Sequence, residues 1–514
     1  MDFKFMQCLK NRQFPIDFPG HWVAGVWQKE SRSEQTKISM NPSRDEEIIR
    51  ASLDRGLIAE SLEHAFQSRQ AVESIPLEVK IETIQKFARV LADYGESVVD
   101  AMCIEVGKPR WDSIQDLNSA LDFLNQASTH ISSVENLIIT QRAGDDLKWD
   151  YQLCPVGVTI SFLPFSAPLT TFVQSFTCCL LAGCPLVVMT SGHATLSGIL
   201  YANLIEDVQV PTGVVSFLFG NFALFRTCLA DNRVKAVLYT GSREHCDMIR
   251  RESSGFSDRQ LLLQSGGKNA VIIDASADLT LALKCTLFGV LKSAGQLNTS
   301  TSRVFVHQSF LEQFASSLKK TLANMVIGPT DMADSTPQMG PLYSKKSVEK
   351  FLRFQTMANR SADETIIWGK ARDDVGRGYF VNPGAHIINK FDPNSAYQSN
   401  VMMIPDLAIY PIETTDEAIE YANRTNAAYI LSYIGDSEIL KQKRNDINAP
   451  NVLVNLPTVG AGNYVPVVGK ILCGHHRLGG LGYIYHLTYP QAFLENKKSE
   501  KEFEKNYSYL DLAK

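Results

Sequence analysis

This 514-residue sequence contains ten cysteines, which are candidates for chemistry because a thiolate serves proteins both as a nucleophile and as a metal ligand. No two of them form a Cys-x-x-Cys pair, and no histidine lies at a zinc-finger spacing from them. We therefore expect reduced thiols in an intracellular protein, several of them in the core, and no metal site. The cysteines are Cys8, Cys103, Cys154, Cys178, Cys179, Cys184, Cys228, Cys246, Cys285 and Cys473.

Two polar segments hold further candidates. The segment 293–306 reads SAGQLNTSTSRVFV and contains the adjacent hydroxyls of Thr299 and Ser300. Without a base beside them these hydroxyls would be weak nucleophiles. His475 and His476 follow one another near the C-terminus. Because neighbours on an extended segment point to opposite faces, we expect them to share no metal ion.

The composition is that of an ordinary globular protein, with 45% hydrophobic and 20% charged residues, and the length predicts two or three domains. The formal net charge of −5 gives no reason to expect a nucleic-acid partner. The N-terminus has no continuous apolar run, so we expect no secretory signal and a cytoplasmic protein. The most apolar stretch, 163–189, is interrupted by Gln174, Gly183 and Pro185, which favours a buried helix and strand over a membrane span.

The elements that must position these residues follow from the spacing of the apolar side chains. From about residue 46 to about residue 130, three-to-four spacing predicts helices. From residue 155 short apolar runs alternate with helical segments, which favours βαβ units and a parallel, doubly wound sheet. A second alternating block follows Gly266, and the turn-rich segment 141–157 predicts a hairpin. The expected strands are 156–163, 185–189, 214–219, 234–239, 270–273 and 304–306, with others within 378–391 and 429–436.

Several stretches, in order and at matching spacing, together resemble the aldehyde dehydrogenase superfamily over about residues 22 to 495. Within it the sequence looks most similar to succinylglutamate semialdehyde dehydrogenase of bacterial arginine catabolism, through its segments at 105–113 and 473–477. The matching stretches are EVGKPRWDS at 105–113, YTGS at 239–242, SGGKNAVII at 265–273, the loop at 293–306, TTDEAIEYANRTNAAYILS at 414–432 and CGHHR at 473–477.

This resemblance implies the aldehyde dehydrogenase fold. That is an α/β fold with a Rossmann-like cofactor domain, an α/β catalytic-type domain and a small β-hairpin oligomerisation element. The expected ranges are 1–136 plus 156–264 for the first, 265–470 for the second, and 137–155 plus 471–514 for the third. The resemblance also implies an oligomer, either a dimer or tetramer of this chain or a complex with another protein.

The reaction that the resemblance implies needs three side chains. A Cys thiolate attacks an aldehyde, a Glu activates water, and an Asn amide stabilises the oxyanion. Matching the motifs residue by residue puts these roles on Asn298, Gln264 and Ser166. A carboxamide has no electron pair comparable to that of a thiolate, and Gln264 accepts no proton at neutral pH. All three catalytic positions are therefore substituted.

Most of the positions that hold the cofactor in the family are substituted as well, and only Ser191, Gly241 and Ser242 are retained. The glycines that shape the family's turns, such as Gly266, Gly267 and Gly295, match. We therefore expect no bound cofactor; NAD or NADP is implied by the resemblance alone. The cofactor positions are Met189, Ser191 and Gly192 at the adenosine ribose, Gly241 and Ser242 at the pyrophosphate, Phe225 near the adenine, and Val401 and Met403 at the nicotinamide.

Three functions are compatible with this pattern. The first is a catalytically silent protein of this fold that acts as a non-catalytic subunit or regulator. The second is an NAD(P)-dependent dehydrogenase that oxidises a semialdehyde with a relocated nucleophile, either Cys473 or Thr299. A small buried thiol is the alternative interpretation of Cys473. The third is a small-molecule binding protein that uses the old aldehyde tunnel without reaction.

Overall fold

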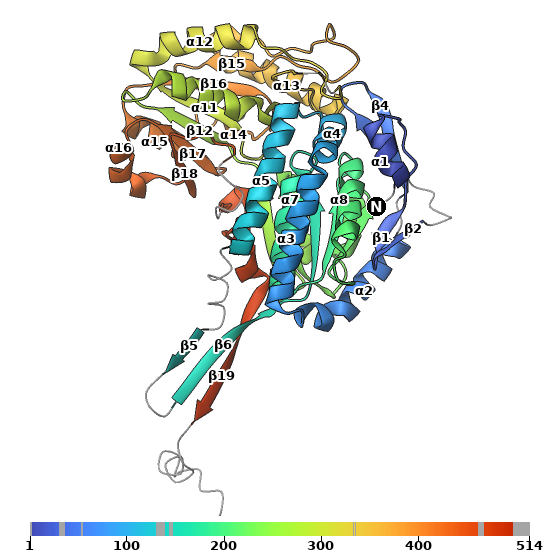
Figure 1. Cartoon of the computed structure of the whole chain (residues 1–514). Helices are drawn as coiled ribbons and strands as arrows, with labels where there is room; N and C mark the ends of the chain where they lie inside the picture. The colour runs from blue at the N-terminus through green and yellow to red at the C-terminus, as the bar shows by residue number, and fades with distance from the viewer. Residues whose placement is uncertain are drawn as a thin grey trace, which may run out of the picture.

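The structure is a computed structural model that describes residues 3–29, 36–52, 55–129, 139–142, 147–332, 334, 336–460 and 467–496. It has two α/β lobes and a projecting three-stranded arm (Figure 1). The first lobe is built on a seven-stranded sheet and the second on another. The segment 266–268 joins the last strand of the first sheet to the first strand of the second. The residue ranges assigned to the domains stay a prediction.

The sheet of the first lobe has the order β11-β10-β7-β8-β9-β1-β2. The five strands from β11 to β9 are parallel, and β1 and β2 are added antiparallel at the edge. The central strands are buried at every position, as expected for parallel strands covered on both faces. The strands are β1 (His21–Val23), β2 (Val26–Gln28), β7 (Val158–Leu163), β8 (Leu186–Thr190), β9 (Val215–Phe219), β10 (Val234–Gly241) and β11 (Gln260–Ser265).

Helices α7 and α8 pack against this sheet, and α3, α4 and α5 pack on them (Figure 1). The ring of Phe172 on α7 contacts that of Phe87 on α3, inside one large apolar core. Helix α7 ends at Gly183, whose φ of 82° is the left-handed conformation that glycine adopts readily. The helices are α1 (Phe3–Lys10), α2 (Gly56–Glu73), α3 (Leu77–Asp93), α4 (Gly95–Glu105), α5 (Arg110–Thr129), α7 (Pro168–Ala182), α8 (Thr195–Val208), α9 (Phe222–Cys228) and α10 (Arg243–Ser253).

The sheet of the second lobe has the order β14-β15-β16-β13-β12-β17-β18, and all its pairs are parallel except β14 with β15. The predicted alternation of strands and helices after Gly266 is therefore confirmed. The strands are β12 (Asn269–Ile273), β13 (Thr301–His307), β14 (Glu364–Ile367), β15 (Gly384–Ile387), β16 (Asp406–Ile412), β17 (Ile430–Ile434) and β18 (Asn451–Val454).

Helices and short 3₁₀ segments complete this lobe and the C-terminal segment. The helices are α11 (Leu279–Leu291), α12 (Leu311–Ala323), α13 (Lys345–Ser361), α14 (Ala396–Ser399), α15 (Thr415–Asn423) and α16 (Ser437–Gln442). The 3₁₀ segments are η1 (Lys292–Gly295), η2 (Gln308–Phe310), η3 (Arg444–Asp446), η4 (Ile471–Cys473) and η5 (Gly480–His486).

The arm contains β5 (Ile139–Arg142), β6 (Leu147–Pro155) and β19 (Thr488–Asn496), paired antiparallel in the order β19-β6-β5. It extends away from both lobes (Figure 1). The predicted hairpin is thus present as β5 and β6. Its expected turn at 143–146 lies outside the described residues, as do 137–138 and 497–514.

One prediction about the N-terminal region is wrong. Residues 46–52 were expected to begin a helical region, but β4 (Glu46–Ser52) pairs antiparallel with β3 (Thr36–Asn41). The burial of Ile48, Ile49 and Ala51 against the first core favours a strand, and the first long helix begins only at Gly56. In the part of the chain that the structure describes, no helix has both the length and the apolar character needed to cross a membrane.

Candidate functional site

A cavity of about 1250 Å³ is lined by residues of both lobes. From the first lobe it takes the segments that follow the carboxyl ends of β7, β8, β9 and β10. In open parallel sheets this edge is where ligands bind, because the loops there converge. The second lobe contributes Gln296 and the segments 342–350, 393–404 and 423–427.

Six of the eight predicted cofactor positions lie on this cavity, and the other two do not. Met189 is buried within β8, and Phe225 is buried in α9. The Phe225 ring packs against those of Phe162 and Tyr239, two residues that do line the cavity. The six that line the cavity are Ser191, Gly192, Gly241, Ser242, Val401 and Met403.

The three predicted catalytic positions differ in their relation to the cavity. Ser166 lies on the cavity wall, but Asn298 and Gln264 are not among the lining residues. The carbonyl of Asn298 accepts from the Asn269 side-chain amide at 3.0 Å and from the Gly267 N–H at 3.3 Å, so it serves to hold the backbone. Gln264 belongs to β11, where it pairs with β10 on one side and bridges Gly474 on the other.

The relocated nucleophile that the sequence suggested is not supported at Cys473. Its side chain is fully buried against Tyr429 and Ile430, and burial raises the pKa of its thiol to about 12. At neutral pH this thiol is protonated, and a thiol reacts through its thiolate. Cys473 thus fits the alternative interpretation, a small core residue.

The neighbouring histidines have different surroundings. His475 Nδ1 accepts from the Arg250 guanidinium at 3.3 Å, while His476 has a left-handed backbone with φ of 56°. Among the described residues, no group of three or more His, Cys, Asp or Glu side chains is arranged to hold a metal ion.

The loop that follows α11 has an unusual backbone. Ser293 and Ala294 have φ of 52° and 50°, and Gly295 has φ of 69°. For a residue other than glycine, this left-handed conformation costs roughly 1–2 kcal/mol, so the surrounding structure must hold it. The loop ends at Gln296, whose amide donates to the Ser293 carbonyl at 2.9 Å and accepts from the Tyr343 N–H at 3.0 Å.

Aromatic rings from both lobes form one wall of the cavity. The Tyr343 ring lies 4.0 Å from that of Phe165 and 5.0 Å from that of His193, centroid to centroid. Deeper along the wall, Phe222 stacks on His245 at 3.6 Å. Sequence reasoning missed this wall because it examined only the positions that align with cofactor contacts.

More cations than carboxylates line the cavity. Lys37, Arg243, Lys350 and Arg424 stand against the single lining carboxylate of Glu244. Arg243 and Arg424 also form ion pairs, at 3.6 Å with Asp247 and at 3.0 Å with Glu420, so the excess charge rests mainly on the two lysines. A concave surface lined mainly by one sign of charge concentrates ligands of the opposite sign. The arrangement is therefore suited to an anion.

The two histidines on the wall add no charge at neutral pH. Burial, with a contribution from Lys37, lowers the pKa of His193 to about 4. Burial also lowers the pKa of His245, whose Nδ1 lies 2.8 Å from the Tyr239 hydroxyl. The positive character of the cavity thus comes from its lysines and arginines.

Comparison with known proteins places this geometry in a family. The profile of the "Aldehyde dehydrogenase family" matches residues 27–493. The chain belongs to the aldehyde dehydrogenase family. Against 1-pyrroline-5-carboxylate dehydrogenase of Bacillus subtilis it is 23% identical over 476 residues, which cover 90% of this chain and 91% of that protein. Against aldehyde dehydrogenase 1 of Tanacetum cinerariifolium it is 24% identical over 489 residues, 93% and 95% of the two chains.

The solved structures agree on the fold. The structure of 1-pyrroline-5-carboxylate dehydrogenase from Thermus with bound NAD superposes with a TM-score of 0.87 at 21% identity, and covers 96% of this chain and 95% of that chain. The aldehyde dehydrogenase fold predicted from the sequence is therefore confirmed. The relatives cited are not succinylglutamate semialdehyde dehydrogenases, and that finer resemblance stays a prediction.

The cavity wall of this aldehyde dehydrogenase family member does not fit a dinucleotide well. A Cβ built on Gly192 would lie 2.4 Å from Cε of Lys37, so the lysine stem already covers this glycine. In the same way, a Cβ on Gly266 would lie 2.1 Å from Cε of Met403. Neither Gly192 nor Val401 offers a carboxylate that could accept a hydrogen bond from a ribose hydroxyl.

Proposed function

We propose that this member of the aldehyde dehydrogenase family is catalytically silent and binds an anionic small molecule in its cavity. The observation that carries this proposal is the cavity wall itself, which has four cations, one carboxylate and no cysteine. A large concave pocket lined by aromatic rings and a few polar groups is the usual form of a small-molecule site.

The three catalytic positions offer neither a nucleophile nor a base. The side chain of Asn298 is a carboxamide, which is no substitute for a thiolate, and neither Gln264 nor Ser166 accepts a proton at neutral pH. The alternative nucleophile Thr299 lies beside Ser300, whose hydroxyl accepts from the Leu297 N–H at 3.2 Å. No carboxylate or histidine has a hydrogen bond to either hydroxyl among the described contacts, so neither is activated.

The anionic character of the ligand also fits the names of the relatives. The proteins that this chain is similar to include 1-pyrroline-5-carboxylate dehydrogenases, and the sequence resembles succinylglutamate semialdehyde dehydrogenase. Both names denote substrates that carry carboxylates. We propose a carboxylate-bearing ligand of the semialdehyde class, or an analogue of it, in a cytoplasmic protein.

The test combines calorimetric titration with an activity assay. We expect purified protein to bind succinate or inorganic pyrophosphate, to bind NAD weakly or not at all, and to oxidise no aldehyde in the presence of NAD or NADP. Lys37→Ala should weaken anion binding about tenfold, because a hydrogen bond to a charged group contributes roughly 1.5–3 kcal/mol. The matched control is Lys319→Ala, an exposed lysine on α12 away from the cavity.

Two outcomes would contradict the proposal. Aldehyde oxidation that survives purification would restore the dehydrogenase hypothesis, and its loss in Thr299→Ala would name the nucleophile. Equal anion affinity in Lys37→Ala and in the unmodified protein would show that the anion does not occupy this cavity.

A further inference from the structure

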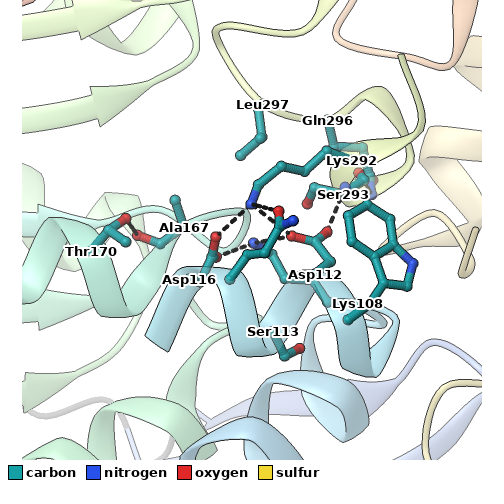
Figure 2. A network of polar contacts seen from close by, with 12 residues as sticks. Lys108, Asp112, Ser113, Asp116, Ala167, Thr170, Lys292, Ser293, Gln296 and Leu297 are labelled. Atoms are coloured by element: carbon teal, nitrogen blue, oxygen red, sulfur yellow. Dashed lines mark hydrogen bonds and ion pairs between the residues drawn. The ribbon is translucent and has the colours of Figure 1, made fainter. Parts of the chain in front are cut away.

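Four charged side chains are buried where the two lobes meet (Figure 2). Lys108 precedes α5, Asp112 and Asp116 lie on α5 in the first lobe, and Lys292 follows α11 in the second. Their side chains are at most 7% exposed. We call this set the interlobe charge cluster.

The charges of the cluster balance. The Lys292 ammonium lies 3.2 Å from Asp112 and 3.1 Å from Asp116, and it also donates to the Gln115 side-chain carbonyl at 3.2 Å. The Lys108 ammonium hydrogen bonds to Asp116 and lies 3.7 Å from Asp112. Two cations and two anions therefore satisfy one another away from water, which is the condition under which buried charges are tolerated.

The ionised state of the cluster is favoured by its geometry. Burial acts against the ammonium of Lys292, but the carboxylates of Asp116 and Asp112 outweigh it and raise the pKa. Burial likewise acts against the carboxylate of Asp116, but Lys108 and Lys292 outweigh it and lower the pKa. Removal of one member would leave a buried charge without its partner.

The cluster holds the left-handed loop directly. The second carboxylate oxygen of Asp112 accepts from the Ser293 N–H at 2.7 Å, across the boundary between the lobes. Lys292 and Ser293 are adjacent, so one carboxylate binds both the side chain of the first and the backbone of the second. This bond and the ion pairs fix the point at which the chain enters the strained backbone of 293–295.

A continuous set of hydrogen bonds runs from this point to the cavity. The Ser293 carbonyl accepts from the Gln296 amide, and the Gln296 carbonyl accepts from the Tyr343 N–H. The Tyr343 ring then packs against Phe165 and His193 of the first lobe. The path thus begins on α5, crosses to the second lobe and returns to the first lobe at the cavity wall.

We propose that the interlobe charge cluster holds the two lobes together at this point, with Lys292 as a positioning residue. Its ion pairs fix the conformation of the 293–297 loop, and through it the aromatic cavity wall, before any ligand binds. Parting of the lobes at this point would remove Lys292 and leave two carboxylates facing Lys108 alone. This role of the interlobe charge cluster does not depend on the ligand class proposed above, because all four side chains belong to the chain itself.

The test is hydrogen–deuterium exchange at two amides, those of Ser293 and Tyr343. In Lys292→Met the apolar stem remains but the charge is lost, and we expect exchange at both amides to rise tenfold or more. Lys292→Arg keeps the charge and should restore much of the protection. Asp116→Asn combined with Lys292→Met restores neutrality and should recover part of it.

Controls separate positioning from general destabilisation. Lys284→Met removes an exposed lysine from α11 and should change neither amide. Leu318→Ala removes a side chain of α12 from the core of the second lobe and leaves a cavity there. It should lower Tm without a selective rise in exchange at Ser293 or Tyr343. If Lys292→Met fails to fold, Gln296→Met tests the same path: Tyr343 should exchange faster while Ser293 stays protected. Unchanged exchange in Lys292→Met, or an equal rise in Leu318→Ala, would overturn the proposal.

Discussion

At the scale of single residues, His193 links the cavity wall to stability. Its pKa is lowered to about 4, first by burial and then by Lys37, whereas an unfolded histidine titrates near 6.5. The unfolded chain therefore binds a proton that the folded chain excludes as the pH falls from about 6.5 to about 4. Stability is fully present above pH 6.5 and is lost through this window, by about 3 kcal/mol.

This loss is measured by urea unfolding between pH 7 and pH 4, in the unmodified protein and in His193→Gln. The variant cannot titrate, so we expect its stability to fall less over this window. If the two proteins instead lost stability equally over this window, His193 would take up its proton in the folded state as readily as in the unfolded state. His307→Gln, at a half-buried histidine of the second lobe, provides the matched control.

The thiols offer a second prediction at this scale. Of the ten cysteines, nine are buried and only Cys8 is partly exposed. A thiol reagent should therefore label one site rapidly in the native protein, and Cys8→Ser should abolish that fast phase. Cys473→Ser should leave it unchanged. Fast labelling at Cys473 would instead show an accessible thiol near the cavity and revive it as a nucleophile.

The sequence motifs predicted the position of a residue along the chain better than the direction of its side chain. Turn residues such as Ser191 and Gly241 reach the cavity because strand ends and the loops after them are set by the alternation of elements. Met189 and Phe225 are buried and do not line the cavity, because a motif gives chain position and not the face on which a side chain lies. Lys292 was missed entirely, since its partners Asp112 and Asp116 are distant in sequence and meet it only when the lobes pack.

At the scale of elements, the 293–297 loop allows a test of two separate effects on stability. One is the cost of a left-handed backbone, and the other is the overlap of an added side chain with its neighbours. Gly295 has φ of 69°, and a Cβ added there would lie 2.5 Å from the Ile404 carbonyl carbon. Gly295→Ala should therefore lower the free energy of unfolding by about 2–5 kcal/mol, from left-handed strain together with backbone overlap. Thermal and urea unfolding of the variant measure this effect.

Gly25 supplies the comparison. Its φ of 82° is also left-handed, but no heavy atom lies within 4 Å of an added Cβ. Gly25→Ala should thus show the conformational cost alone, about 1–2 kcal/mol. Equal losses in the two variants would mean that the backbone at Ile404 moves aside without resistance.

The elements themselves were predictable where the pattern was long. The buried runs that became β7 to β10 and β12 to β13 alternate with helices at a regular spacing, so periodicity identified them. The strands β1 and β2 have three residues each and form only by pairing with β9 and with one another. β4 was taken as the start of a helix because the three-to-four spacing that follows it was extended back to residue 46, whereas its strand pairs with β3.

At the scale of the whole molecule, the arm projects away from both lobes (Figure 1). β19 pairs with β6 along one edge, and its other edge pairs with no strand in the described part of the chain. Three large side chains on it are more than half exposed: Tyr489, Phe493 and Leu494. Free strand edges and exposed apolar side chains favour association, so we expect an oligomer that forms through the arm.

Sedimentation velocity of Leu494→Glu tests this expectation. Leu494 is 67% exposed, so a charge there should leave the fold of the single chain unchanged. If the residue is covered by a partner chain, the buried carboxylate should shift the population toward a smaller species at micromolar concentration, because an unpaired charge is costly to desolvate. Leu352→Glu, which places the same charge on an exposed leucine of α13, should sediment like the unmodified protein. An identical profile for both variants would show that the arm is not the interface, and the exposed residues of β19 would then face solvent.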